Sequence, residues 1–205
     1  MIVFYDFETN GFPYDDGRPL SQQPHIVQAA AILADDDGKI VDSFEAISRP
    51  IKWRISASST AVHGITYKYA KENGIQEEEV FDKIKKLMVR AEIRVGHNES
   101  FDRRILEIAS ERFDGGLLKK HLKEMPSICT MENSVNICKI PPTEKMKKAG
   151  YNNYKNPSLQ EVYAKLFNEN FSNAHNAMAD VIACKAVFEE LRKPKKSFWQ
   201  RLFGR

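Results

Sequence analysis

The chain begins with MIVFYDFETNG (residues 1–11), an apolar run that leads into a dense group of polar side chains. The run at residues 1–6 is rich in β-branched and aromatic types, which predicts a strand buried on both faces of a sheet. Side chains two positions apart on a strand lie on one face, so Asp6 and Glu8 are expected to project together. Paired carboxylates repel one another unless a cation lies between them, and their oxygens suit Mg²⁺ or Mn²⁺. Such a pair alone is equally typical of a plain acidic turn.

Two later motifs carry further carboxylates. GHNESFD (residues 96–102) follows a predicted strand at 91–95 and opens a helix, which places Asp102 in the first helical turn. In HNAMAD (residues 175–180), five residues turn a helix by about 500°, so His175 is better placed on the loop before the helix. A loop histidine beside Asp180 is typical of a general base that activates water. Taken singly, each motif is also explained by an ordinary helix-start acid or a solvent-facing histidine.

The remaining sequence predicts alternating strands and helices around this framework. Strands come first and βα alternation follows, which indicates an α/β domain with a mixed sheet. A loop at residues 139–157 contains five lysines, Tyr151 and Tyr154, and is expected either to follow the phosphates of a nucleic acid or to be a solvated, mobile loop. The predicted elements are strands at 25–33, 39–48 and 127–130 and helices at 58–63, 77–90, 101–112, 158–167 and 177–191.

Length and composition limit the class of protein. The 205 residues, 42% hydrophobic and 29% charged, predict one globular domain with a single core. No apolar stretch reaches the ~20 residues of a membrane helix, and no signal peptide is evident. Three cysteines without CxxC spacing indicate a reducing, cytoplasmic location. The net charge of +3 lies entirely in residues 192–205, which hold six basic residues and no acid. We therefore expect a domain at 1–191 and a basic, aromatic tail at 192–205.

In combination, the three motifs carry more information than any one of them. DxE on the first strand, an aspartate at a strand-to-helix junction and HxxxxD at the last helix resemble the DEDDh (DnaQ-like) family of 3′→5′ exonucleases. The resemblance covers about residues 1–191 and includes the AVHGIT segment (61–66). Within this family, the chain is similar to the proofreading epsilon subunit of bacterial DNA polymerase III. The matching catalytic residues are Asp6, Glu8, Asp102, His175 and Asp180.

The resemblance implies a fold, a mechanism and a set of binding residues. The fold would be RNase H-like, with a mixed five-stranded sheet between helices and the acids at its centre. Two Mg²⁺ or Mn²⁺ ions would be held by the four acids, with Asp6 bridging them, Glu8 and Asp180 on the ion with the attacking water, and Asp102 on the other. His175 would accept the proton from that water, and a nucleoside 5′-monophosphate would be released. Substrate contacts are expected from Phe7, Thr9, Asn10, His63, Asn98 and Phe101; for Phe7, core packing is the alternative.

The sequence leaves three classes of function open. The first is a DNA 3′→5′ exonuclease of replication, repair or proofreading that acts on single-stranded 3′ ends. The second is an RNA-trimming exonuclease on the same fold, and the third a binding module, against which the complete catalytic set argues. The tail at 193–205, with its aromatic residues, is expected to dock on a polymerase or sliding clamp, an anionic membrane surface being a weaker alternative.

Overall fold

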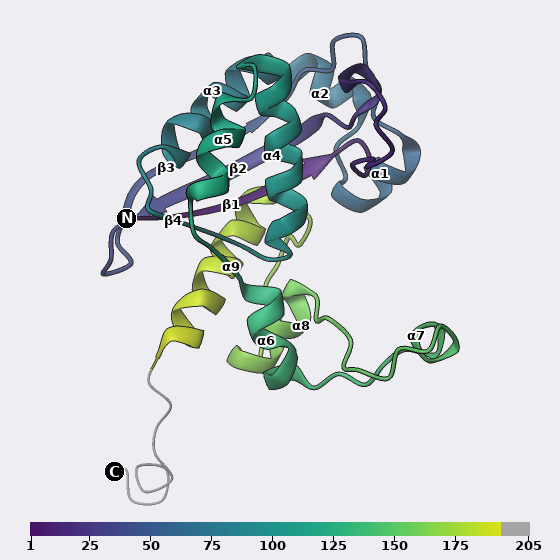
Figure 1. The fold of residues 1–205 in the computed structure, drawn as a ribbon, viewed down its shortest axis with the longest axis vertical. Coiled ribbons are helices and arrows are strands. Elements are labelled where there is room, and N and C mark those ends of the chain that lie inside the picture. Colours follow the sequence, from purple (N-terminus) through teal and green to yellow (C-terminus); the bar gives the residue numbers. More distant parts are fainter. Residues whose placement is uncertain (194–205) are drawn as a thin grey trace, which may run out of the picture.

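The computed structural model describes residues 1–193 and contains one mixed five-stranded sheet in the order β3-β2-β1-β4-β5 (Figure 1). The antiparallel hairpin predicted around Ala34–Gly38 joins β2 to β3, β2 also pairs antiparallel with β1, and β1, β4 and β5 are parallel. β1 is therefore the central strand. The strands are β1 (Ile2–Thr9), β2 (Ile26–Ala34), β3 (Ile40–Ile47), β4 (Ile93–Gly96) and β5 (Ser127–Cys129).

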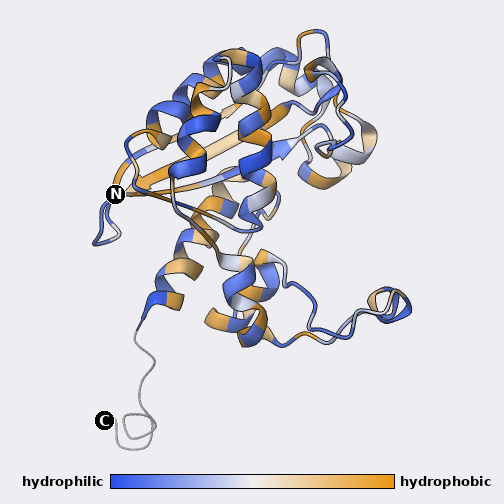
Figure 2. Cartoon of the chain, in the orientation of Figure 1, coloured by the Kyte–Doolittle hydropathy of each residue, from blue (hydrophilic) through white to orange (hydrophobic). Residues whose placement is uncertain are grey.

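Side chains of β1 alternate between two apolar layers, as the period of a strand requires. Val3 and Tyr5 belong to the larger core, under α3 (Glu77–Met88), α4 (Glu99–Phe113) and α5 (Leu117–Glu124). Ile2 and Phe4 belong to the smaller core, under α9 (Ala177–Arg192). Figure 2 shows the same arrangement, with apolar strands between helices whose outer faces are hydrophilic. By this alternation Asp6 and Glu8 lie on the α9 side of the sheet.

Shorter helices complete the domain on both sides. α1 (Ala57–His63) and α2 (Tyr67–Asn73) surround a small third core next to β2, while α6 (Thr130–Cys138) and α8 (Leu159–Phe167) lie beside α9. Leu20–Gln22 form one turn of 3₁₀ helix in the loop after β1. Within the described residues, no helix has both the length and the apolar composition needed to cross a membrane.

The predicted fold class is confirmed, and the differences concern short elements. β1 extends to Thr9, past the predicted end at residue 6, so Glu8 lies within the strand as Asp6 does. Three helices, α2, α5 and α7 (Glu144–Lys148), were not expected, and residues 130–138 form a full nine-residue helix. α9 ends at Arg192, one residue past the predicted boundary. Residues 194–205, most of the predicted tail, lie outside the described residues.

Residues 139–157, named here the lysine arm, form an ordered projection from the body of the molecule (Figure 1). The arm contains the five-residue helix α7 (Glu144–Lys148), which begins where the Thr143 hydroxyl accepts a hydrogen bond from the Met146 amide at 3.2 Å. Nearer the body, the Lys155 amide donates to the Ile140 carbonyl at 2.9 Å and joins the two legs of the arm. The solvated loop predicted here is thus exposed but has regular structure.

Candidate active site

Three elements bring the predicted catalytic side chains to one end of the central strand. β1 supplies Asp6 and Glu8, the first turn of α4 supplies Asp102, and α9 with the loop before it supplies Asp180 and His175. All five line a single cavity of about 300 Å³. Residues that are up to 174 positions apart in the sequence therefore meet in one place, as the motif analysis anticipated.

Backbone hydrogen bonds fix the two aspartates that come from helices. The Phe7 amide of β1 donates to Asp102 Oδ1 at 3.0 Å, which ties the start of α4 to the strand that carries the other two acids. The His175 amide donates to Asp180 Oδ2 at 3.1 Å. His175 has a φ of 65°, a left-handed conformation that is uncommon for residues other than glycine. Asn176 caps α9, because its side chain accepts from the Ala179 amide at 3.1 Å.

Gln28 on β2 holds the first turn of α9 against the sheet. Its Oε1 accepts from the Ala177 amide at 3.1 Å, its Nε2 donates to Glu45 at 2.8 Å, and it pairs with Glu8 across the β1–β2 ladder. The sequence motifs do not indicate that Gln28 holds α9 in this way. The sequence signal was present, since Gln28 is the polar interruption in the otherwise apolar run of β2.

The four carboxyl groups lie close together, two of them buried (Glu8 and Asp102) and two half-buried (Asp6 and Asp180), and the pKa values of all four are raised. Burial raises the pKa of Glu8 to about 7 and that of Asp180 to about 6, with the charge of Asp180 adding to the shift of Glu8. Burial, and then the charges of Asp102, Asp180 and Glu8, raises the pKa of Asp6 well above its usual range. The pKa of Asp102 is also raised well above its usual range by burial, against the stabilising Phe7 amide. The cluster therefore resists carrying its full negative charge.

The donor set fits a divalent cation. Ligand atoms of Glu8, His175 and Asp180 all lie within 4.8 Å of one another, and Asp6 and Asp102 line the same cavity. Asp180 Oδ1 is buried and has no hydrogen-bond partner among the described residues, so an acceptor faces the site unused. Burying such an oxygen is costly unless a donor or a cation satisfies it. Carboxylate oxygens are the ligands that hard divalent ions prefer.

We expect the metal-free protein to lose stability as the pH rises from 4 to 8. The folded-state pKa values of Glu8 and Asp180 are raised above their unfolded values, so the folded state binds more protons through this range. The stabilisation that these two protonated groups provide is complete below about pH 4. It is lost as the pH rises through their folded-state pKa values, about 6 for Asp180 and about 7 for Glu8. The expected loss is about 2–3 kcal/mol, or about 5–10 °C in Tm. Thermal unfolding in chelator across this range measures it.

The same series with Mg²⁺ or Mn²⁺ provides the comparison. A bound cation favours the charged carboxylates, so the metal should raise Tm most at pH 8 and least at pH 5. Asp82→Asn on α3 is the matched control, because Asp82 is exposed and lies outside the cavity. A metal-free Tm that rises steadily from pH 4 to pH 8 would contradict the clustering of these acids.

A second cavity, of about 590 Å³, adjoins the first and has Phe7, Glu8, Phe12 and Phe101 in common with it. Thr9, Asn10 and His63 line the second cavity, and Asn98 lines the first. All six predicted substrate residues therefore border one of the two cavities. The two ring nitrogens of His63 differ in their hydrogen bonds. Nδ1 accepts from the Ile65 amide at 3.0 Å, and the buried Nε2 has no partner among the described residues.

The predicted substrate residues differ in how free their side chains are. Phe7 is only 4% exposed and packs against Tyr5 with ring centroids 5.7 Å apart, as the core-packing alternative anticipated; only its edge borders the cavities. The Asn10 amide is engaged in structure: Oδ1 accepts from the His25 amide at 2.7 Å, and Nδ2 donates to the Arg54 carbonyl at 3.0 Å. Thr9 Oγ1 donates to the Gly11 carbonyl at 2.7 Å. Phe101 is half-buried, packs against the larger core and lines both cavities.

Phe12 and His97 line the site and were not identified from the sequence. Phe12 is 77% exposed, and its ring meets Phe101 edge-on with centroids 6.0 Å apart. An aromatic residue directly after the DFETNG motif is the signal that could have revealed it. His97 lies in the catalytic cavity, and burial lowers its pKa to about 4. Its Nε2 donates to the Pro157 carbonyl at 3.0 Å, which leaves Nδ1 to accept from the Thr130 hydroxyl, also at 3.0 Å.

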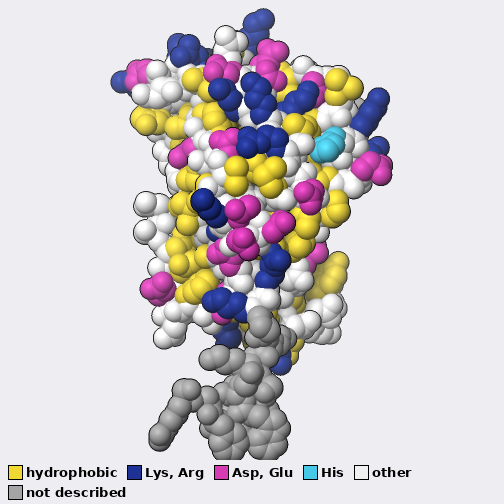
Figure 3. All heavy atoms as spheres, turned by 90° about the vertical axis from the view of Figure 1, so that its left-hand side faces the viewer, with side chains coloured by type: hydrophobic (Ala, Val, Ile, Leu, Met, Phe, Trp, Pro, Cys, Tyr) yellow, Lys and Arg dark blue, Asp and Glu magenta, His cyan; other side chains and the backbone are white. Residues whose placement is uncertain are grey.

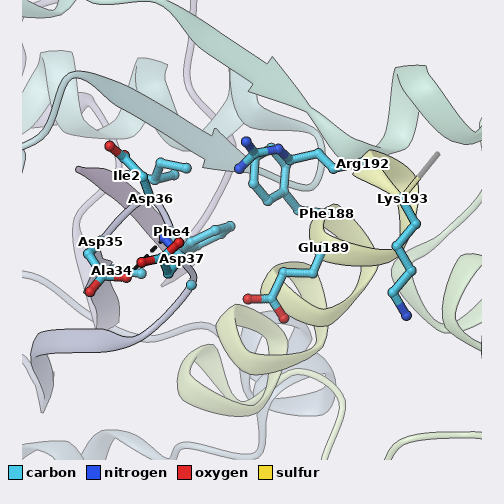
Figure 4. Close-up of a pocket in the computed structure, with 11 residues that line it drawn as sticks. Ile2, Phe4, Ala34, Asp35, Asp36, Asp37, Phe188, Glu189, Arg192 and Lys193 are labelled. Carbon is cyan, nitrogen blue, oxygen red and sulfur yellow. Dashed lines mark hydrogen bonds between the residues drawn. The ribbon is translucent and has the colours of Figure 1, made fainter.

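Another cavity, of about 450 Å³, lies at the opposite end of β1 and has no lining residue in common with the catalytic one (Figure 4). Phe4 and Phe188 form part of its wall, with Glu189 and the acidic β2–β3 turn beside them. Gly38 in that turn has a φ of 85°, a left-handed conformation that favours glycine, and a Cβ there would also displace the end of the Glu189 side chain, whose Oε1 would lie 2.6 Å away.

Comparison with known proteins agrees with this arrangement. The sequence model of the RNase T family, described as exonuclease, matches residues 3–188. A structure of exonuclease I is similar over 98% of this chain and 43% of that chain, with 20% identity and a TM-score of 0.71. E. coli exonuclease I in complex with a dT13 oligonucleotide gives 20% identity, 98% and 42% coverage, and a TM-score of 0.71. At this identity the likeness establishes the fold.

The chain spans less than half the length of these exonuclease I structures. No curated protein sequence matches it. Because the family match covers most of the chain, the chain belongs to the RNase T exonuclease family, the DEDDh (DnaQ-like) group of metal-dependent 3′→5′ exonucleases.

Proposed function

We propose that this protein removes nucleoside 5′-monophosphates one at a time from the 3′ ends of single-stranded DNA. The observation that carries the proposal is the meeting of four buried or half-buried carboxyl groups and one loop histidine in a single cavity beside a larger, aromatic-lined one. Family membership supports the reaction type. Replication, repair or proofreading is the cellular setting that we assign to this activity.

The roles follow from where each group lies. Two divalent ions, Mg²⁺ or Mn²⁺, when held by Asp6, Glu8, Asp102 and Asp180, would stabilise charge on the attacking and leaving oxygens of an in-line displacement at phosphorus. His175 lies beside Glu8 and Asp180 on an exposed loop, where it accepts the proton of the attacking water. Phe12 and Phe101 offer aromatic surface to the terminal base, and His63 Nε2 offers a donor to the terminal nucleotide.

The choice of DNA over RNA rests on the similar structures. E. coli exonuclease I was solved in complex with dT13 and dA16 oligonucleotides, which are single-stranded DNA. An RNA-trimming activity on the same fold is the alternative, and it depends on whether the cavity accepts a 2′-hydroxyl. Docking of the tail at 193–205 on a polymerase or sliding clamp stays a prediction, as does the domain boundary at residue 191.

Digestion of a 5′-labelled oligonucleotide tests the proposed function. Incubation of single-stranded DNA with the protein and Mg²⁺ should yield a ladder of progressively shorter labelled products, because removal begins at the unlabelled 3′ end. Addition of chelator should stop the reaction. An RNA of the same sequence should be degraded more slowly.

Three controls make the result decisive. A circular single strand should be resistant, since it offers no end, and a 3′-phosphorothioate end should delay the ladder. Immediate release of the 5′ label as a mononucleotide, or cutting of the circle, would overturn the assigned direction. Faster digestion of the RNA would replace DNA with RNA as the substrate class.

A further inference from the structure

The lysine arm concentrates positive charge on a molecule whose body is acidic. Residues 139–157 contain five lysines and one glutamate, a net charge of +4. The other residues of the first 191 contain 20 basic and 27 acidic side chains, a net charge of −7. The face opposite the arm, seen in Figure 3, mixes basic and acidic side chains without a field of one sign. The arm therefore differs from the body to which it is attached.

The arm has no apolar core. Every residue from 139 to 156 is exposed or half-buried. One hydrogen bond joins the legs, and the Tyr151 amide closes the tip by donating to the Met146 carbonyl at 2.9 Å. The side chains of the arm are therefore available at its surface instead of being used in packing.

Two exposed aromatic side chains accompany the cations of this surface. Tyr151 is 64% exposed and Tyr154 is 43% exposed. Two of the five lysines are engaged with neighbours: Lys147 with Glu144 at 2.8 Å, and Lys155 with Glu161 at 2.7 Å. Exposed aromatic rings among cations are typical of surfaces that bind single-stranded nucleic acids, where rings stack on bases and lysines face phosphates.

The base of the arm is fastened to the wall of the catalytic cavity. Pro157, the last residue of the arm, accepts the hydrogen bond of His97, and His97 lines the cavity together with the four acids. In Figure 1 the arm extends on the side of the molecule where β1 ends and α1 lies, away from the N-terminus. From Pro157, the nine residues back to Lys148 reach at most about 30 Å.

The position of the arm beside an acidic cavity agrees with the electrostatics of binding a nucleic acid. A cluster of carboxylates repels the phosphates of an incoming strand, and the metal ions offset that charge only at the scissile end. Cations that attract the rest of the strand must therefore lie outside the cavity but close to it. The lysine arm lies outside the cavity, and its base at Pro157 is hydrogen-bonded to His97 of the cavity wall.

We propose that the lysine arm holds the single-stranded portion of a nucleic acid whose 3′ end occupies the catalytic cavity. The lysines at its tip face phosphates, and Tyr151 and Tyr154 stack on bases. This inference rests on the proposed function and extends it, because it makes the length of the strand, and not only its end, a determinant of binding.

Binding of a 5′-fluorescent dT20 to the full chain, followed by anisotropy in chelator so that no cleavage occurs, tests the charged part. The variant Lys145→Ala/Lys147→Ala/Lys148→Ala should bind about 10–100-fold more weakly at 100 mM salt. Its plot of log affinity against log salt should be shallower by about 2, since each phosphate contact on a single strand contributes about 0.7. The control Lys83→Ala/Lys86→Ala/Lys120→Ala removes the same charge from exposed positions on α3 and α5.

The variant Tyr151→Ala/Tyr154→Ala tests the stacking part without a change of charge. It should weaken binding about 5–150-fold for each base that loses its ring, and should leave the salt slope as it is. Unchanged affinity in this variant would overturn stacking. Equal losses in the arm triple and the control triple would overturn the arm as a binding surface, because net charge alone would then explain both. Thermal unfolding checks that each variant is folded.

Kinetics separate this inference from the proposed function. The ratio of kcat/KM on dT20 to kcat/KM on a trinucleotide should fall at least about tenfold in the arm triple and stay constant in the control triple. If the wild-type chain degrades neither substrate, the proposed function fails, while the anisotropy experiment still decides whether the arm binds a strand. A constant ratio in the arm triple, with dT20 still digested, would assign the arm to another partner, such as an acidic protein.

Discussion

Replacement of Asp6 by alanine or asparagine is expected to abolish exonuclease activity while the metal-free protein becomes more stable. Asp6 lies on the central strand among three other acids, and their charges together with burial raise its pKa. Removing one acid relieves this repulsion, so Tm in chelator should rise by a few degrees. The same change removes a ligand that supports the metal ions, so turnover should fall by at least about 10³-fold.

Asp180→Ala should have the same two effects, because it removes the oxygen that has no partner in the described structure. Steady-state digestion of a labelled oligonucleotide and thermal unfolding in chelator measure both quantities on one preparation. Asp82→Ala on α3 is the matched control and should change neither by much. Near-wild-type turnover in either site variant would refute the assignment of these acids to a metal site, and a large fall in Tm would show that they stabilise the fold instead.

His175→Ala is expected to reduce turnover about 10²–10⁴-fold, the usual contribution of a general base. The histidine is exposed, lies on the loop before α9, and places a ring nitrogen within 4.8 Å of Glu8 and Asp180 oxygens. Because four carboxylates suffice for hard divalent ions, the affinity for Mn²⁺, measured by calorimetry, should change little. Added imidazole should restore part of the rate, which a purely structural role would not allow.

The measurement of metal affinity distinguishes two roles for His175, a general base and a metal ligand. The same geometry that places the ring beside two acids would also suit a metal ligand. A large loss of Mn²⁺ affinity in His175→Ala would therefore assign the ring to the metal and contradict the general-base role. His121→Ala on α5, an exposed histidine outside both cavities, is the matched control and should leave turnover and metal affinity unchanged.

The central part of the fold was predictable because strong periodic signals agree with the tertiary structure. β1 and β2 are mostly apolar and largely buried on both faces, and α3 carries Val80, Ile84 and Leu87 at helical spacing. The positions of His175 and Asn176 followed from helix geometry alone, since a side chain five residues before Asp180 cannot lie on its face of the helix. These local signals needed no knowledge of distant contacts.

The elements and residue roles that the sequence did not predict depend on contacts that a local pattern does not show. α2 buries only Ala70, so it has too few apolar residues to produce a period, whereas α5 has Leu118 and Leu122 at helical spacing but is only eight residues long. His97 and Gln28 act through partners more than 30 positions away in the sequence, which no local pattern reveals. Where long-range contacts determine the role of a residue, the sequence shows the residue type and leaves the role undetermined.

The position of α9 has a consequence for biosynthesis. This helix, the last one described in the chain, brings Val181, Cys184 and Phe188 to the smaller core and Asp180 to the catalytic cavity. A nascent chain that has not yet released residues 177–192 from the ribosome therefore presents β1 with one side uncovered and the acid cluster incomplete. Translation that stops before this point yields a polypeptide without nuclease activity and with an exposed apolar sheet, a ready target for chaperones and proteases.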